Sequence, residues 1–192
     1  MVKAILPFCA SSKTSIHNHV FLEGVKAALV ADKKWNKGNY KKQPVAGLKA
    51  FGRVYAGWAF SQDFYREKLY KKFGFENAED LLKDWETDHA TNWDANNLLT
   101  KLKTWQLNDI SKGPLYEGNY IKALKSIRAK TILMPCNQDL YFRTEDNKYD
   151  NKFIHRSSLR PINSPYGHCA ANPGNDKNFE RQLDKNIKEL LS

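Results

Sequence analysis

The feature that most constrains this sequence is a long stretch of helical periodicity, residues 16–106, set between apolar runs typical of buried strands. Apolar side chains in the stretch recur at steps of three and four residues, first at Val20, Phe21, Val25, Ala28 and Leu29. No strand pattern interrupts the stretch. A fold with this sequence must therefore accommodate a block of helices between two parts of whatever sheet the flanking runs form.

Three apolar runs flank this block. Residues 4–10 and 130–136 read as buried strands, and residues 158–163 as a third, which Pro161 makes irregular. Helical stripes precede the second run and close the chain. This order predicts an α/β fold in which helices cover a small sheet. We expect a core strand and loop over residues 1–15, a helical cap over 16–107, and the rest of the α/β core over 108–192.

Polar residues within the stretch mark where helices should begin and end. Asn77 and Asp94 each precede an apolar stripe and can accept a hydrogen bond from a backbone N–H of the first turn. Gly74 follows a short stripe and suits the position just after a helix.

Composition excludes several classes of protein. The 192 residues include three scattered cysteines, too few for a disulfide framework, and 41% hydrophobic residues, too many for a disordered chain. No apolar run approaches the roughly 20 residues of a membrane span, and the start has no signal-peptide pattern, so we expect a cytoplasmic location without a membrane. The net charge of +10 is spread over dispersed lysines interleaved with acids, which does not favour nucleic acid as a partner.

Two polar residues follow the second and third strand-like runs. Asp139 comes after residues 130–136, and His168 comes after residues 158–163, beside Gly167. Ligands bind beyond the carboxyl ends of parallel strands, and acid then histidine is the order of an α/β-hydrolase triad. A serine hydroxyl needs a histidine to take its proton and a carboxylate to hold that imidazole. Taken singly, Asp139 and His168 are each better explained as ordinary turn residues.

Several segments, in order along the chain, resemble the homoserine O-acetyltransferase family and its hydrolase relatives. Residues 129–142, AKTILMPCNQDLYF, are similar to the strand that bears the acid, and residues 159–168, LRPINSPYGH, to the histidine loop. Residues 92–96, NWDAN, resemble an element of the family's cap, and residues 31–40 its entry. The resemblance implies a partial α/β-hydrolase sheet, containing the last strands, with a helical cap insertion.

The sequence departs from the family's pattern in three places. No glycine begins a G-x-S-x-G elbow, so we expect the nucleophile, its strand and the oxyanion hole to lie upstream of Met1 and this chain to be the C-terminal part. Cys169 follows His168 where we expect aspartate in true homoserine acetyltransferases. Asn92 stands where those enzymes carry a basic residue. The last two changes remove charges suited to an amino-acid substrate and favour the hydrolase-like relatives.

Other residues could in principle supply a nucleophile or bind a metal. Cys9 and Ser11 follow the first strand-like run, and Cys169 adjoins His168, but a thiolate needs a lowered pKa and a well-placed base. For Cys9 and Cys136 we expect buried, inert thiols. His17 and His19 lack an acidic partner or a zinc-binding spacing, so we expect surface histidines and no metal.

The resemblance implies acyl transfer or ester hydrolysis through a serine acyl-enzyme. Asp139 would orient the imidazole, and His168 would act as general base and then general acid. Trp93, Asp94 and Tyr141 are candidates for the walls of the substrate pocket. The substrate would be a small-molecule ester or acyl donor and acceptor, no cofactor is needed, and a homodimer is left open. The alternative is a catalytically inactive fragment or an interaction module.

Overall fold

The computed structural model describes residues 2–192, so Met1, where the first predicted segment begins, lies outside the described residues. The chain divides into two compact units. The sheet unit comprises Met1–Lys13, Ala59–Asp63 and Asp109–Ser192, and the helical unit comprises Thr14–Trp58 and Phe64–Asn108. The predicted boundaries at residues 15 and 107 stay a prediction. Ala59–Asp63, from within the predicted cap, groups with the sheet unit.

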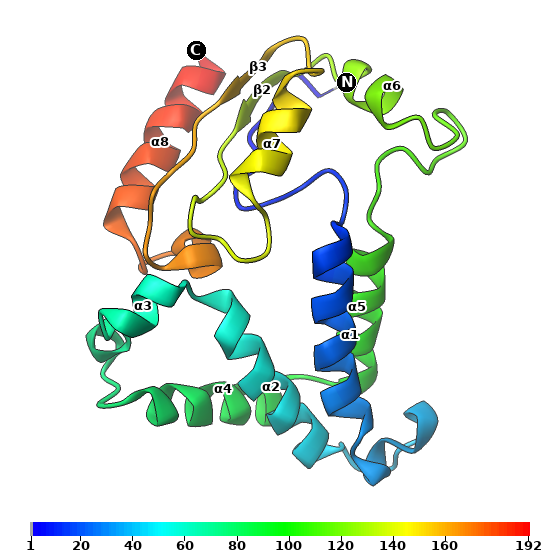
Figure 1. Ribbon diagram of the computed structural model, residues 1–192, viewed down its shortest axis with the longest axis vertical. Helices are drawn as coiled ribbons and strands as arrows, with labels where there is room; N and C mark the ends of the chain where they lie inside the picture. The colour runs from blue at the N-terminus through cyan, green and yellow to red at the C-terminus, as the bar shows by residue number, and fades with distance from the viewer. Residues whose placement is uncertain (1) are drawn as a thin grey trace. The chain divides into compact units, whose positions relative to one another are not determined.

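The sheet unit is built on three parallel strands in the order β1-β2-β3 (Figure 1). They are β1 (Ala4–Ile5), β2 (Lys130–Leu133) and β3 (Ser157–Leu159), with Ala4 opposite Lys130 and Thr131 opposite Ser157. Single bridges from Phe8 to Met134 and from Cys136 to Ile162 continue the parallel pairing beyond the strands. The carboxyl ends of the strands therefore point to the same edge of the sheet.

Helices cover both faces of this sheet. The helices are α6 (Tyr120–Lys125), α7 (Thr144–Asn151) and α8 (Lys177–Leu191), with a 3₁₀ turn, η3 (Gly167–Ala171). Leu133 packs in a cluster with Leu124 of α6 and Ile154 after α7. The next residue, Met134, is contacted by Asn186 of α8 at 3.4 Å. Because neighbouring residues of a strand point to opposite faces, α6 and α8 lie on opposite sides.

The first strand is shorter and less buried than the sequence predicts. An apolar run over residues 4–10 favours a buried strand, but β1 contains two residues, both half-buried, and Phe8 is 38% exposed. The run is broken at Cys9, whose φ of 43° is incompatible with an extended strand.

The helical unit contains the predicted helices. They are α1 (Ile16–Val30), η1 (Lys33–Gly38), α2 (Val45–Ala59), α3 (Gln62–Arg66), η2 (Leu69–Phe73), α4 (Ala78–Asn92) and α5 (Ala95–Leu107); α2 ends and α3 begins in Ala59–Asp63. Residues 16–107, all of which are described, include no strand, as predicted. Asn77 and Asp94 cap α4 and α5 by accepting from Asp80 and Asn97, and Gly74 ends η2 with a φ of 87°.

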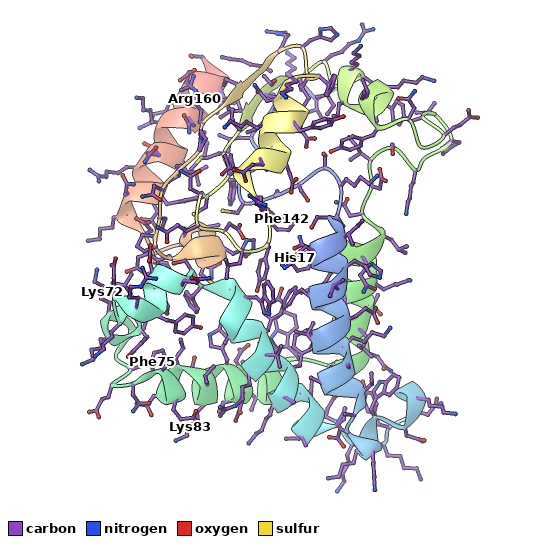
Figure 2. All side chains as sticks on the ribbon, viewed as in Figure 1. His17, Lys72, Phe75, Lys83, Phe142 and Arg160 are labelled. Carbon is purple, nitrogen blue, oxygen red and sulfur yellow. The ribbon has the colours of Figure 1, made fainter. Side chains whose placement is uncertain are left out.

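The apolar stripes of the helical unit form its core. Leu22, Val25 and Leu29 of α1 are completely buried, and α1 lies beside α5 (Figure 1). Lysines occupy the outside: Lys72 of η2 and Lys83 of α4 are exposed (Figure 2). The exposed lysines fit the interpretation of the positive charge as solvated helix surface.

Candidate active site

Asp139 is held rigidly in the turn that follows β2. Its backbone N–H donates to the carbonyl of Cys136 at 3.1 Å. Its Oδ1 accepts from the backbone N–H groups of Tyr141 at 2.7 Å and Phe142 at 3.2 Å. The carboxylate side chain is fully buried, with 0% exposure. Two N–H donors on one oxygen leave the other oxygen, Oδ2, directed at a different partner.

His168 is positioned by a tight turn that requires glycine before it. Gly167 has a φ of 61°, and a Cβ there would lie 2.7 Å from the backbone nitrogen of Ser61. Only glycine allows the backbone to approach so closely in this conformation. The preceding loop is fixed because the buried Ser164 hydroxyl accepts from the N–H of Tyr166 at 3.3 Å and contacts Asp176. The histidine is thus carried on backbone with little freedom to move.

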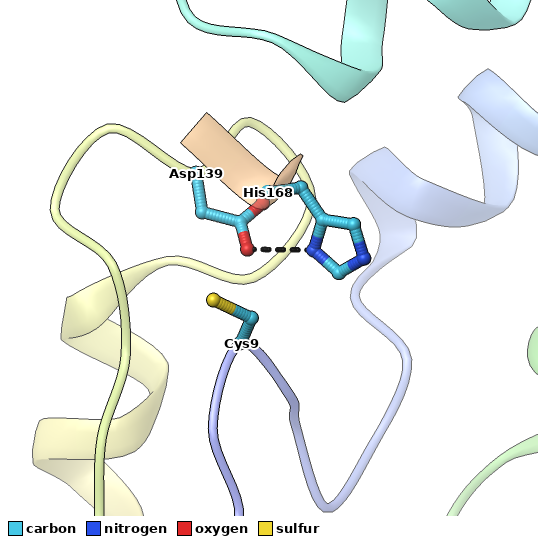
Figure 3. A group of neighbouring side chains, drawn as sticks. All are labelled: Cys9, Asp139 and His168. Carbon is cyan, nitrogen blue, oxygen red and sulfur yellow. Dashed lines mark hydrogen bonds and ion pairs between the residues drawn. The ribbon is translucent and has the colours of Figure 1, made fainter. Parts of the chain in front are cut away.

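The two side chains meet as the sequence predicts. His168 Nδ1 lies 2.9 Å from Asp139 Oδ2, although 29 residues separate them in the chain (Figure 3). The imidazole is 32% exposed, while the carboxylate is inaccessible. With Nδ1 hydrogen-bonded to the carboxylate, Nε2 is the nitrogen that can exchange a proton with another group. The predicted contact is confirmed, and the arrangement can hold an imidazole in one orientation and stabilise its charged form.

Aromatic rings flank this pair. The Tyr141 ring lies 4.8 Å from the imidazole in an edge-to-face arrangement, and the Phe142 ring lies 5.5 Å from it. The structure therefore places Tyr141, a predicted pocket residue, beside His168. Phe142 is not among the predicted pocket residues. Asp side chains commonly accept hydrogen bonds from backbone N–H groups shortly after them, and this tendency could have indicated that Phe142 lies near Asp139.

The cysteines of this region are poor nucleophiles. Cys9, Cys136 and Cys169 are all buried. Burial, followed by the charge of Asp139, raises the pKa of the Cys9 thiol far above its ordinary value. Burial likewise raises the pKa of Cys136 to about 11 and that of Cys169 to about 12. Because the thiolate is the reactive form, none of them resembles an activated cysteine.

The other two predicted pocket residues belong to the helical unit. Asp94 accepts hydrogen bonds from Tyr40 and Gln43, both at 2.6 Å, and from the N–H of Asn97 at 2.9 Å. The hydrogen bond from Tyr40 is the main reason that the pKa of Asp94 is lowered. Trp93 lines a cavity of about 490 Å³ in this unit. A substrate-binding role for either residue stays a prediction.

Trp93 is itself well anchored. Its indole N–H donates to Asp88 at 3.0 Å, and Lys101 Nζ lies 4.2 Å from its ring centre.

His17 and His19, the histidine pair considered in the sequence, are exposed on α1. The centre of the His17 ring lies 5.2 Å from that of Trp58.

Known proteins with a similar sequence include esterases and homoserine O-acetyltransferases. No family model matches the chain. An ethyl acetate hydrolase of Pseudomonas veronii is 31% identical over 193 aligned positions, covering 100% of this chain and 54% of that protein. A protein of Corynebacterium glutamicum described as "Probable esterase" is 29% identical, covering 96% of this chain and 53% of its own length. Several homoserine O-acetyltransferases match at 23–26% identity.

Solved structures agree with these sequence matches. The acetyl esterase MekB superposes with a TM-score of 0.93 at 31% identity, over 99% of this chain and 55% of that one. Together the matches define the chain as having an α/β-hydrolase fold, with a partial sheet and a helical cap. More particularly, it is a homologue of the homoserine O-acetyltransferases and esterases of that fold, corresponding to their C-terminal portion. The chain spans about half the length of these relatives.

The structure also bears on the membrane prediction. None of the helices in residues 2–192 combines the length and apolar character that a bilayer crossing requires. A cytoplasmic location and a homodimer stay predictions.

Proposed function

We propose that Asp139 and His168 are the acid and the base of a Ser-His-Asp triad that hydrolyses small esters. The observation that carries the proposal is the 2.9 Å contact between Asp139 Oδ2 and His168 Nδ1 at the carboxyl edge of the sheet. A buried carboxylate fixed by two backbone N–H groups supports the role of orienting the imidazole. The serine is the one member that residues 1–192 do not supply in a G-x-S-x-G elbow.

The chemistry requires His168 to take up a proton and give it back twice, once when the acyl-enzyme forms and once when it is hydrolysed. A serine hydroxyl attacks the ester carbonyl while its proton passes to His168 Nε2, and Asp139 stabilises the imidazolium. The imidazolium then gives that proton to the departing alkoxide, which leaves an acyl-enzyme. Water, deprotonated by the same nitrogen, hydrolyses the acyl group and restores the serine.

An uncharged acyl ester is the substrate class that we propose. Relatives described as an ethyl acetate hydrolase and an acetyl esterase support a short acyl group. The residue after His168 is the uncharged, buried Cys169, and the residue before Trp93 is Asn92. The chain thus lacks charge at two positions where charged residues would suit an amino-acid substrate, which favours hydrolysis over transfer to homoserine.

The test compares two proteins from the same gene. One is this 192-residue chain, and the other includes any in-frame sequence that precedes the Met1 codon. With p-nitrophenyl acetate we expect turnover only from a protein that contains a G-x-S-x-G elbow, and a loss of about 10⁶-fold in kcat on His168→Ala.

The results of this test distinguish an esterase from an inactive fragment and show where the nucleophile lies. Turnover by the 192-residue chain that His168→Ala abolishes would mean that a nucleophile lies within these residues, and Cys9 and Ser11 would be mutated first. A stop codon upstream, with equal background rates in the chain and its His168→Ala variant, would overturn the esterase proposal in favour of an inactive fragment or interaction module.

A further inference from the structure

A third side chain with a metal-binding atom lies beside the Asp139–His168 pair and has no role in the proposed hydrolysis. The Cys9 thiol comes from the segment that follows β1, so three separate segments meet at this point (Figure 3). The Cys9 Sγ, an Asp139 carboxylate oxygen and a His168 ring nitrogen all lie within 4.8 Å of one another. Cys9 adopts a left-handed backbone conformation, with a φ of 43°, that few non-glycine residues tolerate.

The electrostatics of this cluster favour a cation. Asp139 is completely buried, and the partners of its carboxylate are two backbone N–H groups and the His168 imidazole. A divalent cation bound by the thiolate of Cys9 and the carboxylate of Asp139 would give a neutral group. Neutralisation removes the main cost of holding buried negative charge.

We propose that Cys9, Asp139 and His168 form a zinc site, with the metal bound by Cys9 Sγ, an Asp139 carboxylate oxygen and His168 Nδ1. Sulfur, nitrogen and oxygen together are a donor set typical of Zn²⁺, whereas Mg²⁺ and Ca²⁺ prefer oxygen alone. Three protein ligands leave a fourth position for water. The 32% exposure of the imidazole provides a route of entry.

The distances require only a small adjustment. Ligand atoms around a tetrahedral zinc are separated by about 3.3–3.6 Å, from bond lengths of about 2.0–2.3 Å. The nitrogen and oxygen would move apart from 2.9 Å, and the sulfur would close from a separation of at most 4.8 Å. Rotation of the imidazole and the thiol supplies movements of this size. On binding, Cys9 releases one proton to solvent, and the proton on His168 Nδ1 moves to Nε2.

This movement of the proton gives the site a regulatory consequence, which rests on the proposed function. A metal at Nδ1 leaves neutral His168 with its proton on Nε2, so Nε2 can no longer accept one from serine. Zinc binding and general-base catalysis are therefore mutually exclusive at this histidine, and Zn²⁺ acts as a reversible inhibitor.

The binding test needs no catalytic activity. The reduced 192-residue chain is titrated with Co²⁺, whose thiolate complexes show a sulfur-to-metal charge-transfer band, and Zn²⁺ is then added. We expect one equivalent of Co²⁺ to produce the band and Zn²⁺ to remove it. Loss of a direct ligand should cost at least about 100-fold in affinity, since loss of a second-shell partner already costs 10–100-fold.

Matched variants identify the ligands. Cys9→Ala and Cys9→Ser should both lose the band, whereas Cys169→Ala, which removes another buried thiol beside His168, should keep it. His168→Gln should keep the fold and weaken Co²⁺ binding. Circular dichroism and a melting curve confirm that each variant is folded. No band in the wild-type chain, a band that survives Cys9→Ala, or one lost in Cys169→Ala would overturn the site.

Inhibition is tested separately, on an active form of the protein. Zn²⁺ should lower its ester turnover, and Cys9→Ala should be less sensitive to Zn²⁺ relative to its own zinc-free rate. A band in the 192-residue chain, with no ester turnover from a protein that contains a G-x-S-x-G elbow, would reject the proposed function and leave the metal site standing. Ester turnover from that longer protein, with no band in the 192-residue chain, would leave the proposed function standing and reject the metal site.

Discussion

Asp139 in the sheet unit and Asp94 in the helical unit are both well-bonded carboxylates, yet their partners differ in kind. Asp94 accepts only from neutral groups: the Tyr40 hydroxyl, the Gln43 amide and a backbone N–H of α5. Asp139 accepts two backbone N–H groups and also binds a titratable imidazole that reaches solvent. Neutral donors secure a fold, whereas a titratable partner allows a proton to move. We therefore expect Asp139 to act in chemistry and Asp94 to act chiefly in holding the helical unit together.

Of the effects that distinguish Asp139 from Asp94, the largest should be on the rate of ester hydrolysis. In the form of the protein that hydrolyses esters, Asp139→Asn should lower kcat by about 10⁴-fold, because the imidazolium loses its counter-charge and the imidazole its correct tautomer. Asp94→Asn should change kcat by less than about threefold. A loss of about 1–2 kcal/mol of unfolding free energy leaves a typical domain folded, so the catalytic pair should stay in place. Steady-state kinetics on both variants decide the matter. Equal losses would mean that Asp94 also belongs to the reaction site.

The sequence predicts two parts of this comparison, one from a local rule and one from the topology of parallel strands. Asn77 and Asp94 were identified as helix caps because a cap depends on a few consecutive residues. The contact between Asp139 and His168 was predictable because parallel strands bring their carboxyl ends to one edge, and the resemblance to a known family reinforced it.

The parts that could not be predicted depend on tertiary contacts. Cys9 approaches Asp139 because β1 pairs with β2 and the chain then turns through a left-handed residue, and neither is visible in the sequence of residues 4–10. The sequence predicts a buried strand over the same run because six of its seven residues have apolar side chains of the kind that strands bury. The half-exposed Phe8 shows that apolar composition alone does not determine burial.

The second prediction compares glycines of the two units. Gly167→Ala would place a methyl group 2.7 Å from the Ser61 nitrogen at a φ of 61°. Left-handed strain and overpacking should together cost about 2–4 kcal/mol of unfolding free energy. Gly57→Ala, in α2, meets no atom within 4 Å and should stabilise the protein by about 0.5–1 kcal/mol. Urea denaturation measures both, and a neutral Gly167→Ala would show that the histidine turn is not rigid.

The third prediction tests the structural role of Asp94. Asp94→Ala removes a helix cap and two side-chain partners, and should cost about 1–2 kcal/mol. The pKa of Asp94 is lowered in the folded protein, chiefly by Tyr40. Its contribution to stability is therefore present above the unfolded pKa of about 3.9 and is lost as pH falls through the folded value. Unfolding curves between neutral and acidic pH should converge for the wild type and the variant; a constant difference would contradict this origin.

The smallest expected effect comes from His89, the buried histidine of the helical unit. Its Nδ1–H donates to the Trp85 carbonyl at 2.8 Å, and its ring stacks between Trp85 at 5.7 Å and Trp93 at 6.2 Å. Burial lowers the pKa of His89, although the carbonyl and Asp88 act in the opposite direction. The neutral ring is thus the form of His89 that the fold favours.

The sign of the pH effect on stability follows from the lowered pKa of His89. A histidine with a lowered folded pKa contributes stability that is present above the unfolded value of about 6.5 and is lost as pH falls through the folded value. Over this interval the wild type should lose more unfolding free energy than His89→Gln. The exposed His155→Gln serves as a control with the wild-type slope. If acidification stabilised the wild type relative to His89→Gln, Asp88 rather than burial would govern the ring, and the helical unit would hold a charged histidine after all.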